Sequence, residues 1–442
     1  MATTATRAQT QVGRARWYRI GVMLFLIYLI TFVDQSSFPI VTPLISTDLQ
    51  ITAAAAGVLL SAFFWGYVIT QIPGGILATR FGPKRVILAS LAIWGLCAIL
   101  CVIVPNYGAL VSIRFAMGLV GGALWPTFAV IVANWYPMRE RGRAATFTMI
   151  SIPLAAVIAS LCSGILTQAV TWYWMFISLG LAAFVMAILF AVFGADSPET
   201  DRRLSEAERN YILAGRLSES ATGPFVGGVF RRPMAWILGG IFLLWQSAFY
   251  GMALWMPSMI AQASGISVAT VGLVSIAPFV IAVIAMLLNS LLSDKTPWGR
   301  GWHAAVPLLI GGAALLAGGY IHGGFSVELL LLYVAVAGLY AGLGSWWAWV
   351  IDNFSRNSSG VVSGFVNFCG NLGLVFGPIL ISVVGGAAQL SSSLFVLGGC
   401  ALTAAIVMIA LSSRRNIRPA GDGPAPDVPA ESRECDPSNT NV

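Results

Sequence analysis

Charged residues are scarce in this chain. Only 9% of its 442 residues are Asp, Glu, Lys or Arg, whereas 58% are hydrophobic; an ordinary soluble domain has about 25% charged residues. Apolar runs longer than about 18 residues recur along the whole length, and each could cross a bilayer as a helix. Because backbone groups in lipid must satisfy one another, the sequence predicts an all-α membrane protein.

Residues that could hold a metal or act as nucleophiles are also few. The chain has two histidines and six scattered cysteines. Cys97 and Cys101 share a helix face with no His or further Cys pair nearby, so we interpret them as small packing residues. The segment "GPKR" lacks the Gly-x-x-x-x-Gly-Lys-Ser/Thr spacing of a phosphate loop. We therefore expect no enzyme, no cofactor and no bound metal.

The apolar runs form two groups of six. The longest polar loop divides them, and "LSEAERNYILAGRL" within it begins with a capping box, Ser205 to Glu208, typical of a short surface helix. We expect a polar tail at 1–19, a first six-helix bundle at 20–194, a linker at 195–233, a second bundle at 234–411 and a disordered tail at 412–442. The predicted spans are roughly 20–45, 53–78, 86–104, 107–135, 144–168, 173–194, 234–260, 270–292, 304–321, 327–351, 359–384 and 393–411.

Basic residues indicate how the chain is oriented. Every Lys and Arg except Arg114 lies in alternate loops or in the two termini. Cytoplasmic segments carry this excess, so both termini are expected in the cytoplasm, in a bacterial cytoplasmic membrane. The net charge of +7 then reflects topology and contact with anionic membrane lipids, and it does not indicate nucleic-acid binding.

Corresponding loops of the two halves echo one another. "GGILATRFGPKR" follows the second span and contains Gly75, Arg80, Gly82 and Lys84, while "SLLSDKTPWGR" follows the eighth and contains Asp294. Here the chain resembles the major facilitator superfamily, whose loop signature is G-x-x-x-D-R-x-G-R-K. It matches that signature at the four residues named, but has Thr at position 79 where an acid is usual. The resemblance implies two six-helix bundles, with these loops involved in gating.

Longer segments narrow the resemblance. "RWYRIGVMLFLIYLITFVDQSSFPIVTPLI" and "RFAMGLVGGALWPTFAVIVANWYPMRERGRA" are similar to the anion:cation symporter family, which includes sugar-acid transporters. The similarity covers nearly the whole chain and is looser after residue 260. It implies secondary active transport of a small organic anion by alternating access.

Two positions depart from that family. It usually has an Arg directly after the acid of the first span and a Glu seven residues after the Arg of the fourth; here these positions are Gln35 and Gly121. Both members of a second charge pair are thus absent together. Without that Arg the chain has fewer groups to bind a substrate with several carboxylates. Without that Glu it lacks a residue that usually carries the proton in that family.

Two ionisable residues lie well inside the spans. Asp34 is in the first and Arg114 in the fourth. A charge in lipid is costly, so each is expected to have a partner or to face a cavity. One interpretation is an ion pair that only joins the two helices. We favour the other, in which Arg114 binds the substrate anion and Asp34 carries a proton in a cavity near the midplane.

Aromatic and amide side chains are the other candidates for the substrate site. A Trp can instead serve packing or an interfacial belt, and the amides of Asn367 and Asn371 can join helices. Because successive helical residues point in different directions, the tryptophans of "GSWWAWVIDNF" cannot all face one cavity. Besides Arg114, the predicted substrate-binding residues are Gln35, Gln246, Tyr250, Trp346, Trp349, Asn367 and Asn371, with Gln71, Trp125 and Asn289 as further candidates.

These observations predict a monomeric proton symporter for a small organic carboxylate, with an aromatic monocarboxylate among the candidates. Its expected partners are the organic anion, protons and membrane lipids. A uniporter or exchanger of the same substrates and an exporter of drug-like compounds remain alternatives. A sensor with a transporter fold would need a signalling domain, and the short C-terminal tail is not expected to form one.

Overall fold

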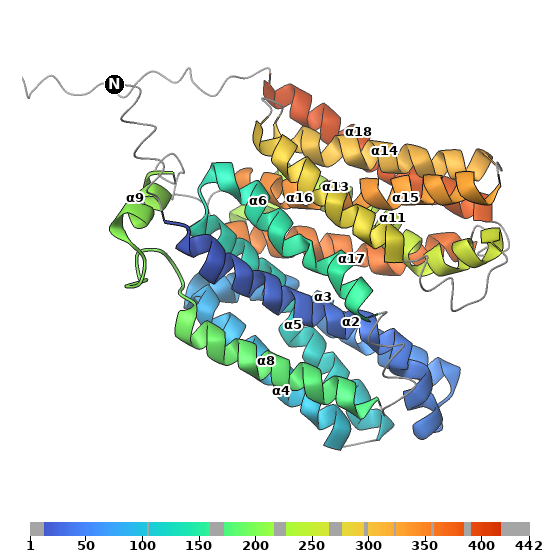
Figure 1. The fold of residues 1–442 in the computed structure, drawn as a ribbon, viewed down its shortest axis with the longest axis horizontal. Helices are drawn as coiled ribbons and strands as arrows, with labels where there is room; N and C mark the ends of the chain where they lie inside the picture. Colours follow the sequence, from blue (N-terminus) through green and yellow to red (C-terminus); the bar gives the residue numbers. More distant parts are fainter. Residues whose placement is uncertain are drawn as a thin grey trace, which may run out of the picture.

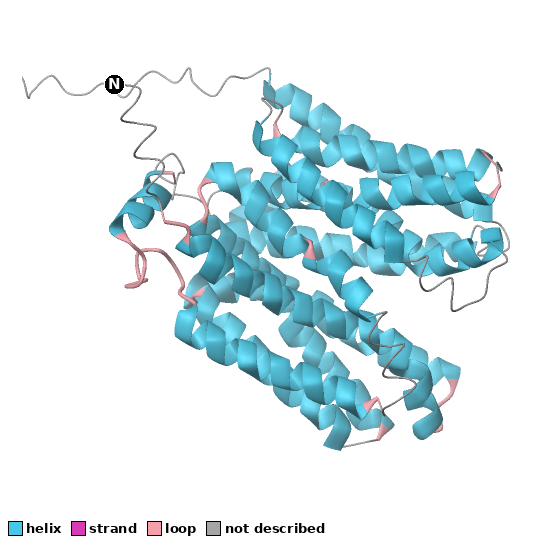
Figure 2. Ribbon diagram, in the orientation of Figure 1, coloured by secondary structure: helices cyan, strands magenta, loops and turns pink. Residues whose placement is uncertain are grey.

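The computed structural model describes residues 13–103, 106–159, 172–215, 227–264, 276–295, 299–321, 324–354, 358–383 and 390–416. Within these ranges the chain is helices and loops, without a strand (Figure 2). Of the predicted tails, 1–19 and 412–442, the parts 1–12 and 417–442 lie outside the description, as does the side chain of Asp294, whereas 16–19 and 412–416 are helical.

The first half of the chain supplies the elements up to the linker. The segment Arg16–Gly21 is a turn of π-helix that leads into α2. Helix α6 is continued by helical residues at 151–159. The helices of this half are α2 (Val22–Asp48), α3 (Ala53–Phe81), α4 (Pro83–Ile103), α5 (Tyr107–Trp135), α6 (Met138–Met149) and α8 (Tyr173–Phe193), followed in the linker by α9 (Glu206–Ala214) and α10 (Gly227–Phe230).

The second half repeats the pattern with one interruption. The predicted tenth span, 327–351, is divided into α15 and α16 at Gly342. The helices are α11 (Pro233–Ser264), α13 (Ile276–Lys295), α14 (Arg300–Tyr320), α15 (Phe325–Ala341), α16 (Leu343–Asp352), α17 (Ser359–Val383) and α18 (Leu390–Asn416).

Eleven helices in the described ranges are long and apolar enough to cross a membrane. The remaining predicted span, 359–384, coincides with α17, so the twelve-span prediction and the all-α fold are confirmed. The fifth span begins at Met138, earlier than the predicted residue 144, with Pro137 as its N-cap. Side-chain caps fix other starts: Thr52 accepts a hydrogen bond from the Ala55 amide and Asn106 from the Ala109 amide.

The helices form two bundles, blue to green for the first half and yellow to red for the second (Figure 1). In the first bundle α3 packs on α5 and α4 on α8, and in the second α11 packs on α17 and α14 on α18. The bundles meet where α17 contacts α3 and α5, and where α6 contacts α13 and α16. We call the end of the molecule that carries α9 the linker end.

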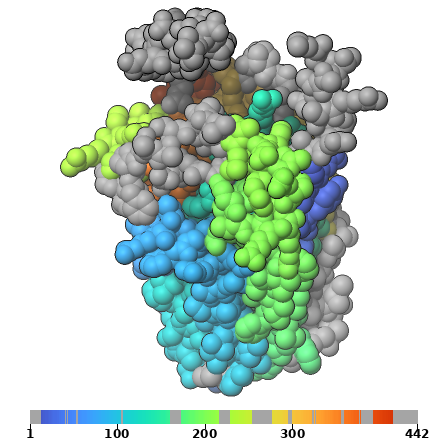
Figure 3. All heavy atoms as spheres, turned by 90° about the vertical axis from the view of Figure 1, so that its left-hand side faces the viewer, coloured from blue at the N-terminus to red at the C-terminus, as the bar shows by residue number. Residues whose placement is uncertain are grey.

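The outer faces of the bundles are apolar. Figure 3 shows one such face, on which α4 and α8 lie side by side. Large side chains exposed there include Ile93, Leu96, Leu181, Val185 and Ile188. A soluble protein rarely exposes so much contiguous apolar surface, so this face is suited to contact with lipid.

A buried charge cluster ties the linker helix to the first bundle. Arg16 donates two hydrogen bonds of 2.8 Å to the Glu140 carboxylate on α6 and one of 2.7 Å to Glu208 on α9. Glu208 also accepts hydrogen bonds from the backbone amides of Ala15 and Arg16. Ser205 caps α9 through the Glu208 amide, as the capping box predicted, but the Glu208 side chain turns to Arg16.

Tyr211 completes this cluster. Its hydroxyl donates a hydrogen bond of 2.9 Å to Glu140. Burial, and then this charged acceptor, raise the pKa of the Tyr211 hydroxyl, so it remains a donor throughout the physiological pH range. The first turn of α6 is therefore held from the linker side by Arg16 and Tyr211.

Replacing Arg16 should destabilise the protein severely. Arg16→Ala would leave the carboxylates of Glu140 and Glu208 buried without their cation, and breaking a buried pair in this way costs about 3–5 kcal/mol. Thermal unfolding in detergent would measure the loss. Arg14→Ala is the matched control, since Arg14 is an exposed arginine nearby. Equal melting temperatures for the two variants would contradict the prediction.

Candidate functional site

A cavity of about 240 Å³ lies between the two bundles. Pockets for drug-sized ligands usually span about 300–1,000 Å³, so this one suits a smaller molecule. Its aromatic wall includes Phe32, Phe64, Phe242, Phe249 and Trp347. Its polar lining consists of Tyr28, Gln35, Ser36, Tyr67, Gln246, Tyr250, Tyr340, Asn367 and Asn371.

The structure brings five of the predicted substrate-binding residues to this cavity. They come from three helices: Gln35 from α2, Gln246 and Tyr250 from α11, and Asn367 and Asn371 from α17. Their amides and hydroxyl can both donate and accept hydrogen bonds. This arrangement can recognise a polar ligand without any charged side chain in the described lining.

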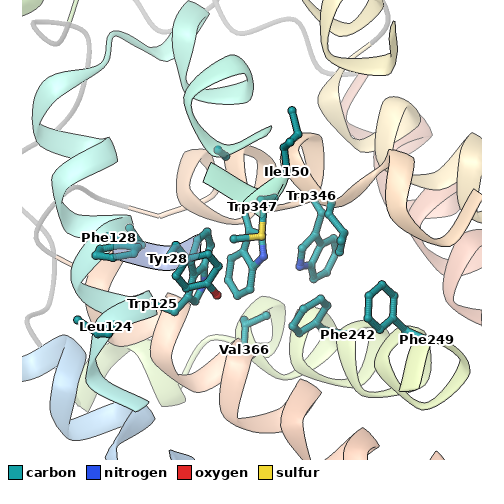
Figure 4. Packing of buried hydrophobic residues seen from close by; sticks show 14 of the residues in the cluster. Tyr28, Leu124, Trp125, Phe128, Ile150, Phe242, Phe249, Trp346, Trp347 and Val366 are labelled. Atoms are coloured by element: carbon teal, nitrogen blue, oxygen red, sulfur yellow. The ribbon is translucent and has the colours of Figure 1, made fainter. Parts of the chain in front are cut away.

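The predicted Trp346 and Trp349 lie outside the lining, whereas Trp347 is part of it. Trp346 is fully buried and stacks on Phe242, with ring centroids 5.5 Å apart (Figure 4). Trp349 packs against Trp346, with ring centroids 5.8 Å apart. A step of one residue turns a helix by about 100°, so only one of the neighbouring rings can face the cavity.

Asn367 also joins the two bundles at the cavity. Its amide nitrogen donates a hydrogen bond of 2.8 Å to the side-chain oxygen of Gln71 on α3. Asn371 donates to the backbone carbonyl of Asn367 on its own helix. Asn367 therefore serves both as cavity lining and as a bridge between helices, which were the two alternatives that the sequence left open.

Small residues let α3 and α17 approach closely next to this bridge. A Cβ added at Gly364 would overlap the carbonyl oxygen of Gln71, and one at Gly75 would overlap that of Gly360. Gly75, predicted from the loop signature, thus lies at the contact between the bundles. The close approach brings Gln71 within hydrogen-bonding distance of Asn367.

Aromatic and charged contacts hold the bundles together at the linker end. Trp125 of α5 packs on Trp347 of α16, with ring centroids 4.6 Å apart (Figure 4). Arg141 of α6 donates a hydrogen bond of 3.2 Å to Asp352 at the end of α16. Arg300 of α14 also pairs with Asp352 and donates to the carbonyl of Met138. These contacts close the linker end in this structure.

Asp34 and Arg114 form a buried ion pair inside the first bundle. The Arg114 Nη1 atom is 3.0 Å from the Asp34 Oδ2 atom, and the residues are 2% and 0% exposed. The guanidinium lies over the rings of Phe38, at 3.7 Å, and Phe63, at 4.9 Å. Such cation–π contacts help to hold a desolvated cation.

The pair is incompletely hydrogen-bonded. Among the described residues, the second carboxylate oxygen of Asp34 and the Nε atom of Arg114 have no hydrogen-bond partner. Leaving a buried charged group without a hydrogen-bond partner costs free energy. The Asp34 oxygen can still accept a hydrogen bond or a proton, and the Arg114 Nε–H can still donate to a ligand.

This pair lies outside the cavity lining, although residues next in sequence to Asp34 and to Phe63 contribute to that lining. Gln35, the neighbour of Asp34, lines the cavity, and so does Phe64, the neighbour of Phe63. Neither Asp34 nor Arg114 is itself in the lining. The charged pair therefore lies inside the first bundle, and its Asp34 is on the same helix α2 that presents Gln35 to the cavity.

The remaining loop-signature residues contact the first bundle. Lys84 donates hydrogen bonds to the carbonyls of Ala191 and Gly194 at the end of α8, where a cation complements the helix dipole. Gly82 has φ +89°, which favours glycine. Arg80 lies over the ring of Phe81. Sequence reasoning missed Asp196, which accepts a hydrogen bond from the Lys84 amide; no motif distinguishes it among the linker acids.

Comparisons with known proteins agree with this architecture. The model of the Major Facilitator Superfamily matches residues 24–378. A probable galactarate/D-glucarate transporter of Bacillus subtilis is 26% identical, with 96% of each chain covered. A putative tartrate transporter of Agrobacterium vitis is 24% identical over 91% of this chain and 92% of that protein. Among solved structures, a proton:xylose symporter has a TM-score of 0.70 at 18% identity, covering 89% of this chain and 95% of that one.

Proposed function

We propose that this chain, which belongs to the Major Facilitator Superfamily, carries a small organic anion across a bacterial cytoplasmic membrane by alternating access. The family and the relatives are transporters rather than enzymes, and relatives named for sugar acids fit the resemblance to the anion:cation symporters. The observation that carries the proposal is the amide-lined cavity between the bundles, together with the buried Arg114–Asp34 pair, whose Asp34 is next in sequence to the cavity-lining Gln35.

The cavity favours a small acid with few carboxylates. Side-chain amides of Gln35, Gln246 and Asn371 can donate to a carboxylate or hydroxyl, and the aromatic wall suits a planar or apolar remainder. Arg114 is the single basic residue within the predicted spans. The family that the chain resembles has a second charge pair at the positions of Gln35 and Gly121, and this chain lacks it. We therefore propose that the substrate is a monocarboxylate rather than a dicarboxylate.

Arg114 and Asp34 are proposed to couple anion to proton. A carboxylate that enters past Gln35 would accept hydrogen bonds from the guanidinium, whose Nε atom has no partner among the described residues. Asp34 then loses its cation and lies beside a second negative charge, so it takes up a proton. Each binding event favours the other, and the loaded site keeps the net charge of the empty one.

The linker end is proposed to face the cytoplasm, because the basic loops lie there. The structure then represents a state closed toward the cytoplasm by Asn367–Gln71, Trp347–Trp125 and the pairs of Asp352. Opening requires these contacts to separate as one bundle moves against the other. We propose that a monomer in contact with anionic lipid performs this cycle.

Uptake into proteoliposomes tests the proposal. The purified chain would be assayed with labelled D-glucarate, L-tartrate, D-gluconate and benzoate, with glucose and choline as uncharged and cationic controls. We expect uptake of at least one monocarboxylate, D-gluconate or benzoate, and neither control. Transport of glucose or choline in preference to every acid would contradict the proposal.

Export of an amphipathic, drug-like aromatic compound is the second candidate. The observation that favours it is the described cavity lining, which has many aromatic rings and no charged side chain. Ethidium efflux from cells that express the chain would test it. Efflux that is unaffected by Arg114→Ala would favour this function over carriage of an anion.

A further inference from the structure

Asn289 on α13 was a candidate for the cavity, but the structure places it elsewhere. It is 8% exposed, does not line the cavity, and lies where α13, α14 and the α15–α16 junction meet. Its amide nitrogen donates hydrogen bonds of 2.9 Å to two backbone carbonyls, those of His303 and Ala341, and is 3.5 Å from the hydroxyl of Ser345.

The carbonyl of His303 lies one helical turn before a proline in α14. In α14 it would accept a hydrogen bond from the residue four positions later, which is Pro307. Proline has no N–H group, so the carbonyl is left for another donor. Asn289 supplies that donor from the neighbouring helix.

Side chains also hold the carbonyls that precede the interruption at Gly342. Asn289 donates to Ala341, the last residue of α15, and the fully buried Trp245 of α11 donates 2.9 Å to the carbonyl of Leu339. Gly342 itself packs tightly, because an added Cβ would lie 2.6 Å from the carbonyl oxygen of Ala304. The interruption is therefore fixed on one side by α14 and on the other by Asn289 and Trp245.

The helices α15 and α16, which meet at Gly342, make different contacts. Tyr340 of α15 and Trp347 of α16 both line the cavity. Of the two, α16 contacts the first bundle through Trp125 and Arg141. The position of α16 relative to α15 therefore matters for whether Trp347 and Asp352 meet their partners across the bundles.

We propose that Asn289 is a positioning residue for the interrupted tenth span: it ties α14 to the α15–α16 junction and so holds α16 in the position that closes the linker end. The inference rests on the proposed alternating access but on no particular substrate. Removing the amide removes the two hydrogen bonds that tie α14 and the junction to α13 in the closed state, so α16 is held there less firmly.

Distances between spin labels test this without any substrate. Labels at Arg139→Cys, exposed on α6, and Asn353→Cys, at the end of α16, would report the linker end in nanodiscs, in a background without the native cysteines. We expect Asn289→Leu to raise the ratio of long to short distances about tenfold, as a differential loss of about 1.4 kcal/mol would. Ser290→Ala, a neighbouring buried hydroxyl on α13, should leave the ratio unchanged.

Adding Pro307→Ala provides a specific rescue. An alanine at 307 restores an N–H for the His303 carbonyl, so Asn289→Leu with Pro307→Ala should return part of the short-distance population. If Asn289→Leu does not fold, Gly342→Ala should open the junction by crowding Ala304 and give the same shift. An unchanged distance distribution in Asn289→Leu or Gly342→Ala, or no recovery in the double variant, would overturn the proposal. An uptake assay that fails for every acid while these distances respond would reject only the proposed substrate class.

Discussion

Replacing Arg114 with alanine is expected to reduce uptake of the transported acid by about thirtyfold or more, since truncating one partner of a buried charge pair costs about 2–5 kcal/mol and every 1.4 kcal/mol is tenfold. Arg114→Lys keeps the charge but loses the planar two-pronged donor that matches a carboxylate, so it should also impair uptake strongly. Initial rates over a range of substrate concentrations, per molecule of reconstituted protein, measure both effects.

A second variant separates recognition from folding. Arg114→Ala alone leaves Asp34, which is 0% exposed, without its cation. Arg114→Ala with Asp34→Asn removes that buried charge and should recover thermal stability but no uptake. Normal substrate affinity in Arg114→Ala would show that the pair only joins α2 to α5, the interpretation that we set aside.

Replacing Asp34 with asparagine is expected to abolish accumulation driven by a pH gradient while leaving exchange of internal for external acid intact. Asparagine has nearly the shape of aspartate but cannot take up a proton, and its side-chain oxygen can still accept a hydrogen bond from Arg114. Uptake by the unaltered protein should rise as external pH falls, whereas uptake by Asp34→Asn should not.

The control for Asp34→Asn is Asp48→Asn, which alters a carboxylate at the C-terminal end of α2 that accepts a hydrogen bond from the indole of Trp172. It should retain pH-driven accumulation. If Asp34→Asn still concentrates the acid in response to a pH gradient, the proton is carried elsewhere and the coupling proposal is wrong.

The architecture could be predicted because membrane helices have a strong sequence signal. Apolar runs of bilayer length fix the spans, and α17 was found although Asn367 and Asn371 interrupt its apolar character. The predicted tenth span could not be divided from sequence alone, because Gly342 is one of several glycines nearby and only its packing against Ala304 marks the junction. The early start of α6 at Met138 likewise depends on contacts that its polar first turn makes with Arg16 and Arg300.

The site was harder to predict for a physical reason. Intramembrane charge directed attention to Asp34 and Arg114, and the structure brings them together at 3.0 Å. Sequence could not tell that their side chains lie outside the cavity lining, since one residue of helical rotation separates Asp34 from the lining residue Gln35. The same ambiguity placed Trp346 and Trp349 in the site instead of Trp347, and assigned Asn289 to the cavity rather than to the carbonyls of His303 and Ala341.

The central claim is that one proton crosses with one organic anion. The most direct measurement encloses a pH-sensitive dye in proteoliposomes and follows internal pH while the acid identified in the uptake panel is added outside, with no initial pH gradient. The account predicts internal acidification that matches labelled uptake at about one proton per monoanion, and neither signal in Asp34→Asn under these conditions, since net uptake needs the proton. Accumulation of the acid by the unaltered protein without acidification would contradict it.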